Sequence, residues 1–342
     1  MVMYRKILPV IFIFLTIIFT GCKRPDFSSV DGFTQGSTYH IVYESSPAND
    51  PASVRAGLEA LFASVDKSLS IYNDSSVISM INSNASDKTD TLFRDVFRLS
   101  RNVWKETGGA FDITVGPLVK AWGFGPDAIR NFDATKLPAL LSLVGMEKVR
   151  LSGDRIVKQS PDMFIDMNAV AQGYTVDLAI SYLKSRGITD CLVEVGGEVR
   201  SSGNKSGEGW KVGIDKPVDG NNDPGRDMEA VLTLNDEALA TSGNYRKFYI
   251  DNGIKYSHTI DPHTGYPARQ TLLSATIVAP DCATADAYAT ACMVVGTEAA
   301  KSIIEKHPFL DGYLIWSDGN GNLKTWASER LKNSVRELND SE

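Results

Sequence analysis

The sequence AQGYTVDLAISYLKSRGITDCLVEVGG, residues 171–197, contains the helix and the strand that decide the fold class. Its first part, Ala171 to Arg186, has the apolar spacing of a helix and stops at Gly187. Its second part, Cys191 to Val195, is a short, mostly apolar run that leads into paired glycines, as a buried strand does. The segment therefore predicts a helix that is followed closely by a strand.

The same two patterns recur along the rest of the chain. They predict strands at residues 38–43, 210–214, 230–234, 247–249 and 273–278, and helices at residues 51–68, 90–107, 283–295 and 298–306. These segments are interleaved without a regular βαβ period, and no repeat or Pro/Ser-rich linker divides them. We therefore predict the α+β class, as a single domain with mixed or antiparallel sheets and packed helices, rather than a doubly wound sheet.

Composition and charge limit the kind of protein that this chain can be. Hydrophobic residues make up 43% and charged residues 23% of the 342 residues, which are ordinary globular values and exclude a disordered or multi-span membrane chain. Asp plus Glu number 42 against 35 Lys plus Arg, which gives a net charge of −7. Because binding to a phosphate backbone relies on a basic patch, nucleic acid is not expected as a partner.

The N-terminal residues have the pattern of a bacterial export signal. Two basic residues precede an apolar run at residues 7–19, which is shorter than the roughly 20 residues of a membrane-spanning helix. Small residues then precede Cys22, as in a lipoprotein signal. We predict a signal peptide at residues 1–21, lipidation of Cys22, a polar tether at residues 22–32 and a folded domain at residues 33–335. The protein would then be anchored to a bacterial membrane and face the periplasm; a plain secretory signal or an uncleaved anchor are the alternatives.

Two segments in the second half carry residues suited to chemistry. Asp286 and Thr290 stand four residues apart in the helical pattern ATADAYAT, so a carboxylate and a hydroxyl share one helix face. Such oxygens suit Mg²⁺, although this spacing is also common on solvated helices. His258 lies in YSHTIDPHTGYP, where a neutral imidazole can take a proton from a hydroxyl nucleophile. A lone histidine beside a turn is, however, more often structural.

Eight segments, taken in order, closely resemble the ApbE family of FAD:protein FMN transferases. They are GSTY (36–39), LSIYNDSSVISMIN (69–82), GGAFDITVGPLVKAWGFG (108–125), IDMNAVAQGYTVD (165–177), VEVGGE (193–198), ATSGNYRKF (240–248), SHTIDPHTGYP (257–267) and TADAYATACMVVG (284–296). The resemblance extends over most of the chain after the signal. It implies an ApbE-like α+β domain with an FAD cleft between two subdomains.

The resemblance also implies the residues of a site. The residues implied to hold FAD are Gln35, Tyr72, Ala110, Phe111, Asp112, Asp166, Gln172, Ser257, His258 and Ile260. Gln35 and Gln172 stand where family members often carry Met and Lys, respectively. The implied ligands of Mg²⁺ are the main-chain carbonyl of Ala169 and the side chains of Asp286 and Thr290.

The reaction implied by the resemblance is phosphoryl transfer. Mg²⁺ would neutralise the FAD pyrophosphate, a Ser or Thr hydroxyl of a partner would attack the FMN phosphorus, and AMP would leave. His258 is implied to be the catalytic residue that activates this hydroxyl. The implied acceptor is an exported or membrane flavoprotein, such as a subunit similar to those of sodium-pumping NADH:quinone reductase (Nqr) or Rnf complexes. The sequence leaves two alternatives open, an FAD-binding lipoprotein without transfer activity and an FAD pyrophosphatase that passes FMN to water.

Overall fold

The computed structural model describes residues 25–125, 132–218, 221, 225–245, 248–251, 254–268 and 271–338. The predicted signal peptide at residues 1–21 and the predicted lipidation site Cys22 lie outside these residues. Within the described ranges, no helix combines the length and the apolar character needed to cross a membrane.

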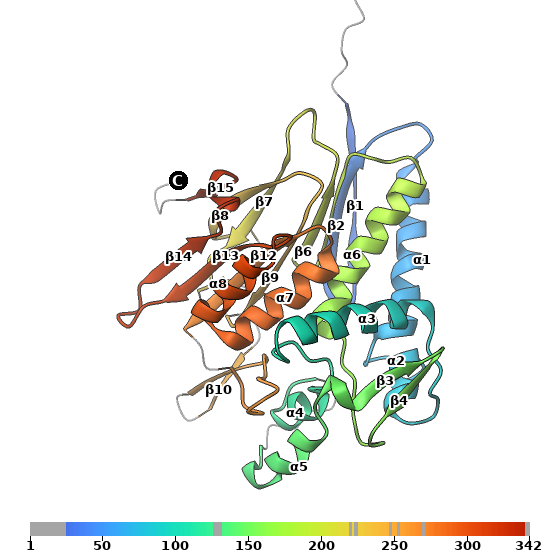
Figure 1. The fold of residues 1–342 in the computed structure, drawn as a ribbon. Helices are drawn as coiled ribbons and strands as arrows, with labels where there is room; N and C mark the ends of the chain where they lie inside the picture. The colour runs from blue at the N-terminus through green and yellow to red at the C-terminus, as the bar shows by residue number, and fades with distance from the viewer. Residues whose placement is uncertain are drawn as a thin grey trace, which may run out of the picture.

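An antiparallel sheet of eight strands forms the centre of the molecule (Figure 1). In spatial order its strands are β1 (Phe27–Thr34), β2 (Ser37–Glu44), β5 (Cys191–Val195), β6 (Glu198–Ser202), β9 (Ala238–Gly243), β12 (Leu272–Ala279), β13 (Asp311–Ser317) and β14 (Leu323–Ala327). Every pair of neighbours in this sheet is antiparallel. The sheet therefore brings residues from both ends of the described chain into one layer.

Five longer helices lie on one side of this sheet (Figure 1). They are α1 (Pro51–Leu69), α3 (Thr91–Glu106), α6 (Asn168–Ser185), α7 (Cys282–Val295) and α8 (Thr297–Lys306). Apolar side chains of α1 and α6 pack on β2 and β5 in one core cluster, whereas those of α7 pack on β12 in another. Helix α3 contributes to the second cluster by packing on α7, α1 and α6. Burial of these apolar faces is the main stabilising contribution to the fold.

A smaller antiparallel sheet packs on the opposite face of the main sheet. It consists of β7 (Trp210–Asp215), β8 (Met228–Leu234) and β15 (Val335–Glu337). Ile214 and Leu232 of this sheet share a core cluster with Val278 and Ile315 of the main sheet. Because both faces of the main sheet are covered, β12 is buried along almost its whole length, including its polar residues Ser274 and Thr276.

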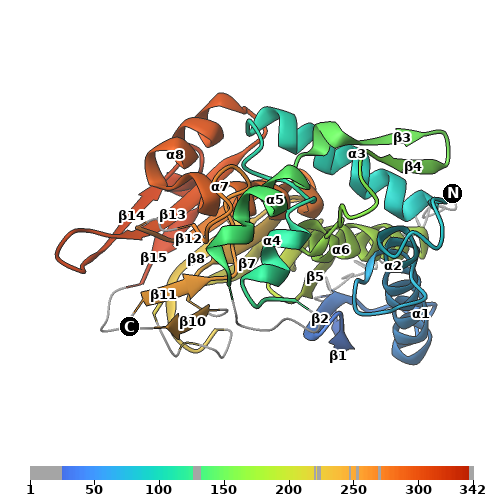
Figure 2. The same ribbon diagram turned by 90° about the horizontal axis from the view of Figure 1, so that it is seen from below.

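The short elements gather at one end of the molecule, seen from below in Figure 2. They are α2 (Val77–Asn82), α4 (Gly116–Ala121), α5 (Leu137–Ser142), the hairpin of β3 (Val149–Ser152) and β4 (Arg155–Lys158), the hairpin of β10 (Phe248–Asp251) and β11 (Ile254–Ser257), and 3₁₀ turns at Ala134–Lys136 and Met146–Lys148. A third 3₁₀ turn, Leu331–Asn333, precedes β15. A separate apolar cluster joins α4 and α5 to Ile260.

The structure confirms the predicted α+β class and a single body with antiparallel sheets. The predicted tether at residues 22–32 is wrong in its second half, because β1 begins at Phe27 and pairs with β2 along its whole length. This strand has one buried residue, Val30, and so lacks the alternation that would have identified it. The folded body consequently begins before residue 33.

Candidate active site

Helices α6 and α7 cross at Gly173, and this crossing brings Asp286 against the start of α6. A Cβ atom on Gly173 would lie 2.4 Å from the Cys282 carbonyl oxygen and 2.9 Å from the Asp286 Cβ, so only glycine allows so close an approach. The Gly173 N–H donates to the Asp286 Oδ2 at 3.2 Å. The carboxylate of α7 is thereby fixed to the main chain of α6.

Asp286 is an acidic residue buried in an alanine-rich helix. It exposes 6% of its surface. Burial raises the pKa of Asp286 to about 7; the Gly173 N–H opposes this shift and the Asp177 carboxylate adds to it. Within the described residues the carboxylate receives one hydrogen bond, so its remaining lone pairs can coordinate a cation. A cation would stabilise the buried negative charge.

Ala169 and Thr290 are the other two predicted metal ligands, through a main-chain carbonyl and a hydroxyl. Ala169 has φ −82° and ψ 15°, which is not helical, in the first turn of α6. In a regular helix the Ala169 carbonyl would accept a hydrogen bond from the Gly173 N–H, but here this N–H donates to Asp286. Thr290 follows Asp286 by one helical turn, and its Oγ1 lies 3.3 Å from the Ser242 Oγ. A carboxylate, a carbonyl and a hydroxyl are hard ligands that fit Mg²⁺.

Such a site would depend on neutral oxygens beside its one carboxylate. The described part of the chain has no group of three or more His, Cys, Asp or Glu side chains placed to hold a metal ion.

The turn between β1 and β2 places Gln35 beside α6. The Gln35 Nε2 donates to the Thr175 Oγ1 at 2.7 Å, and the Thr175 hydroxyl donates to the Ala171 carbonyl at 2.7 Å. Because the Thr175 hydroxyl donates its one proton to Ala171, it can only accept from Gln35. The side-chain amide of Gln35 must therefore point its nitrogen toward Thr175. The Gln35 Oε1 is buried and has no hydrogen-bond partner within the described residues. A buried acceptor without a donor costs about 1–3 kcal/mol, so this oxygen fits a donor group of a ligand.

The side chain of Gln172, a residue of α6, lies against the turn between β5 and β6. Gly196 and Gly197 form this two-residue turn with φ of +68° and +108°, values that favour glycine at both positions. A Cβ atom on Gly196 would lie 2.4 Å from the Gln172 Nε2, so the side chain of Gln172 rests directly on the turn. Gln172 and Thr175 are three residues apart on α6. The two predicted FAD-binding glutamines, Gln35 and Gln172, therefore lie beside the same face of this helix.

Tyr72 and Asp166 are a second predicted pair that the structure brings together. Tyr72 follows α1 and exposes 65% of its surface, whereas the Asp166 N–H donates to the Ile113 carbonyl at 2.7 Å. Burial raises the pKa of Tyr72, and the Asp166 carboxylate raises it further. Burial also raises the pKa of Asp166, against the hydrogen bond that its carboxylate accepts from the Asn168 N–H. An exposed aromatic ring near a carboxylate is suited to a flat ring that carries polar groups.

The predicted segment at residues 110–112 is positioned by the end of α3. Gly108 has φ +62°, its N–H donates to the Lys105 carbonyl at 3.3 Å, and the Gly109 N–H donates to the Trp104 carbonyl at 2.8 Å. These bonds form a Schellman motif, which ends the helix and turns the chain inward. The paired glycines Gly108 and Gly109 therefore end α3.

The side chains of Ala110, Phe111 and Asp112 serve the interior of the protein. Ala110 and Phe111 are 2% and 1% exposed and belong to the main core cluster. The Asp112 Oδ1 accepts from the N–H and hydroxyl of Thr114 at 2.7 and 2.6 Å, and its Oδ2 accepts from the Met146 N–H at 3.1 Å. Burial raises the pKa of Asp112 against these three hydrogen bonds. Contact of this segment with FAD would therefore come mainly from its main chain.

Ser257, His258 and Ile260 lie where the chain leaves β11. Ser257 and Ile260 are 6% and 4% exposed, and Ile260 packs against Trp122 at the end of α4. The His258 ring is half-buried and lies edge-on to the Phe124 ring, with 6.4 Å between the ring centroids. His258 is thus held beside the apolar cluster of α4, while Ser257 and Ile260 are structural neighbours with little exposed surface.

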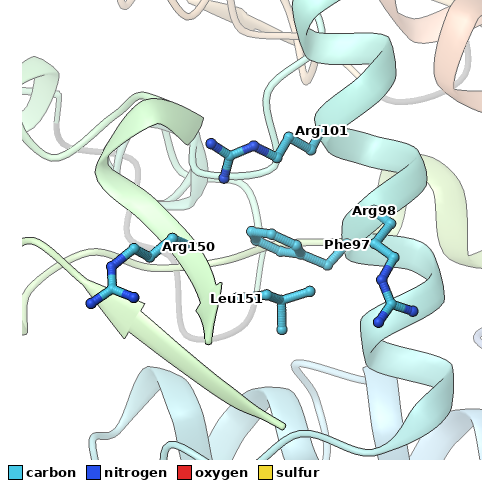
Figure 3. A pocket seen from close by; sticks show the side chains of 5 residues that line it. All are labelled: Phe97, Arg98, Arg101, Arg150 and Leu151. Carbon is cyan, nitrogen blue, oxygen red and sulfur yellow. The ribbon is translucent and has the colours of Figure 1, made fainter. Parts of the chain in front are cut away.

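Two surface pockets lie apart from these residues. One has a volume of about 320 Å³ and is lined by Phe97, Arg98 and Arg101 of α3 and by Arg150 and Leu151 of β3 (Figure 3). The other, of about 410 Å³, is lined by residues of α3 and α7 and by Phe309. Neither pocket is lined by a predicted site residue, so the FAD cleft between two subdomains stays a prediction.

Asp177 is a residue of the site whose role the sequence did not indicate. Its carboxylate accepts from the N–H groups of Cys282 and Ala283 at 2.8 and 2.9 Å and pairs with Arg200 at 2.5 Å. It therefore caps the start of α7, the helix that carries Asp286, from another helix. A single Asp in an amphipathic helix pattern carries no sequence signal for this contact. Thr175, which orients Gln35, was missed for the same reason.

Comparison with known proteins places the chain in a family. The sequence model of the ApbE family matches residues 35–314. An FAD:protein FMN transferase of Vibrio cholerae is 33% identical over 329 residues, which cover 92% of this chain and 95% of that protein. One from Klebsiella pneumoniae is 34% identical over 313 residues, or 89% of this chain and 88% of that protein.

Solved structures agree with the sequence comparisons. A structure of the flavin transferase ApbE from Vibrio cholerae matches with a TM-score of 0.81 and 32% identity, and covers 91% of this chain and 99% of that chain. The apo form of a Pseudomonas stutzeri flavinyl transferase ApbE matches with a TM-score of 0.82 and 28% identity over 92% of this chain and 98% of that chain. The chain therefore belongs to the ApbE family.

Proposed function

We propose that this protein transfers the FMN part of FAD to a Ser or Thr hydroxyl of an exported or membrane flavoprotein in a Mg²⁺-dependent reaction that releases AMP. Family membership makes the chain an enzyme that moves flavin from FAD to a protein. The requirement for Mg²⁺ and the nature of the acceptor are the parts that we propose here.

The observation that carries the proposal is the buried carboxylate of Asp286 at the crossing of α6 and α7. Together with the Ala169 carbonyl and the Thr290 hydroxyl, it would hold Mg²⁺. The bound ion would supply charge neutralisation at the pyrophosphate of FAD. Asp286 would contribute the one negative charge among these three ligands, which is why we assign it the principal role.

FAD would lie against the residues that surround this crossing. The fixed amide of Gln35 offers its buried Oε1 to a donor group of FAD, and Gln172 adjoins the same face of α6. Tyr72 offers an exposed ring beside Asp166. The segment at residues 110–112 would contribute main-chain groups, and Ser257 and Ile260 would shape the far side.

His258 is the proposed catalytic residue. Its ring would take the proton from the acceptor hydroxyl while the hydroxyl oxygen bonds to the FMN phosphorus and the bond from phosphorus to the AMP oxygen breaks. General base catalysis of this kind typically contributes roughly 10²- to 10⁴-fold in rate. His258→Ala should therefore slow transfer by about that factor while the affinity for FAD changes little.

The acceptor and the location belong to the same proposal. The export pattern before Cys22 favours a lipid-anchored enzyme that faces the periplasm, where its acceptor would be an exported flavoprotein such as an Nqr- or Rnf-type subunit. Replacement of Cys22 by Ser should release the protein from membranes or leave its signal unprocessed. Mass spectrometry that finds an intact Met1 or an unmodified Cys22 in the native host would contradict the anchor.

The test is incubation of the protein with FAD, MgCl₂ and a candidate acceptor domain, followed by a denaturing gel. A fluorescent acceptor band that disappears with EDTA and is strongly weakened by His258→Ala is the expected result. A fluorescent band that persists with EDTA would refute the Mg²⁺ requirement. If no candidate acceptor becomes fluorescent and FAD stays bound and intact, a binding lipoprotein would be favoured. If no candidate acceptor becomes fluorescent but FAD is cleaved, a pyrophosphatase would be favoured.

A further inference from the structure

We propose that His263 is a positioning residue, whose side chain fastens the loop at residues 257–267 to the turn that ends α3. The loop carries His258, and the turn leads into the segment at residues 110–112. The inference rests on the proposed function, because His258 is the proposed base of that reaction.

The imidazole of His263 bridges two separate parts of the chain. Its Nε2 lies 3.0 Å from the Gly108 carbonyl oxygen, and its Nδ1 lies 3.1 Å from the Asp261 Oδ1. A carbonyl oxygen only accepts, so Nε2 carries a proton and donates to Gly108. An ionised Asp261 also only accepts, so both bonds form together when the ring carries two protons.

The turn at the end of α3 is built to receive this ring. Gly108 follows the last turn of the helix, where the helix dipole favours a cationic group. A Cβ atom on Gly109, which has φ +90°, would lie 3.1 Å from the His263 Nε2. The ring therefore lies directly against the glycine turn, at a place where the main chain offers an acceptor and no side chain intervenes.

Asp261 makes the other side of the bridge rigid. Its Oδ1 accepts from the His263 N–H at 2.9 Å and its Oδ2 accepts from the Thr264 hydroxyl at 2.9 Å. Its own N–H donates to the Tyr266 carbonyl at 2.9 Å, and its carbonyl accepts from the Gly265 N–H at 2.8 Å. Asp261 is thus hydrogen-bonded to several residues of the loop, so the contact with His263 restrains the loop as a whole rather than one side chain.

A second anchor shows why the bridge matters for His258. The Trp122 Nε1–H donates to the Gly265 carbonyl at 2.7 Å, which ties the loop to α4. His263 adds the tie to α3. With both ties the loop is held from two directions; without His263 only its contacts on the α4 side remain. A misplacement of about 1 Å at a reacting group costs about 10²-fold in rate.

Three variants test this role. His263→Ala removes both bonds, whereas His263→Arg keeps a donor for Gly108 and a positive charge for Asp261. His40→Ala is the matched control, because His40 is an exposed histidine on β2 that pairs with Asp31. Thermal melting followed by circular dichroism establishes that each variant is folded.

The expected result is a fall in kcat for flavin transfer of about 10- to 100-fold in His263→Ala, with a much smaller change in KM for FAD. His263→Arg should recover most of the rate, and His40→Ala should match the wild type. Hydrogen exchange, measured without FAD, should become faster in peptides from residues 257–267 and 108–112 of His263→Ala.

Two results would overturn the inference. Wild-type kcat and wild-type exchange in folded His263→Ala would show that the bridge does not position the loop, and so would an Arg variant as slow as the Ala variant. The exchange measurement decides the inference without any transfer reaction. A wild-type protein that failed to flavinylate acceptors would instead count against the proposed function.

Discussion

Gly173→Ala is the substitution for which the structure gives the sharpest expectation. An alanine in the interior of a helix ordinarily stabilises it by about 1 kcal/mol relative to glycine. Here the added Cβ would lie 2.4 Å from the Cys282 carbonyl oxygen and 2.7 Å from its carbon, and ordinary contacts begin at 3.4 Å. Because these two atoms belong to the main chain of α7, the two helices must separate by about 1 Å.

This separation acts on stability and on the site together. Overpacking costs typically about 1–3 kcal/mol, which exceeds or cancels the helix-propensity gain, so we expect a net loss of about 1 kcal/mol and a fall in Tm of a few degrees. The Asp286 carboxylate would move away from Ala169 by a similar distance. We expect transfer to slow by about 10²-fold, with a higher Mg²⁺ concentration needed for half-maximal rate.

Differential scanning calorimetry and the Mg²⁺ dependence of acceptor flavinylation measure the two effects. Gly319→Ala is the control, since a Cβ atom there meets no atom within 4 Å. If Gly173→Ala melted at or above the wild-type temperature and kept the wild-type rate, the close crossing of α6 and α7 would have no part in positioning Asp286.

Three further substitutions, with Glu305→Gln as a control, separate the metal site from structural acids. Asp286→Asn should lower the transfer rate by at least about 10²-fold through loss of the ligand charge. Glu305→Gln, on the exposed face of α8, should leave the rate unchanged. Equal transfer rates in these two variants would remove Asp286 from the site. Asp281→Ala should lower the free energy of unfolding by about 1 kcal/mol, because Asp281 caps α7. It should not alter the Mg²⁺ requirement, and an altered requirement would contradict the assignment of Asp281 as a cap. Asp112→Asn should lower the free energy of unfolding by about 1–3 kcal/mol, because an amide nitrogen cannot accept from the Met146 N–H. Burial raises the pKa of Asp112 above its unfolded value, so the stability from its protonation is lost as the pH rises through the folded pKa. In urea unfolding, the stability difference between wild type and Asp112→Asn should therefore narrow as the pH rises above about 4, the usual pKa of an aspartate, and a difference that widened would contradict this sign.

Much of the fold could be predicted from the sequence because its longer elements have regular apolar spacing. The helix predicted at residues 90–107 is Thr91–Glu106, and the strand predicted at residues 191–195 has those bounds. The strand β1 could not be predicted, because an edge strand with one buried residue has no alternation to detect. The small sheet on the second face was predicted only in part, since β15 is three residues long.

The candidate site could be predicted in its residue types but not in its contacts. The spacing of Asp286 and Thr290 places them on one face of a helix, and the structure keeps them there. The N–H of Gly173 reaches Asp286 across 113 positions of sequence, and no local pattern specifies such a contact. The side chains of Phe111 and Asp112 serve the core, although their motif suggested a ligand site, because a motif does not distinguish side-chain from main-chain contacts.

The stoichiometry of products tests the central claim most directly. The protein is incubated with FAD that is labelled in both its adenosine and its flavin parts, with Mg²⁺ and an acceptor flavoprotein, and the AMP released is compared with the flavin covalently bound to the acceptor. The account predicts one AMP for each FMN attached through a Ser or Thr phosphoester. AMP released together with free FMN, while the acceptor stays unlabelled, would contradict it.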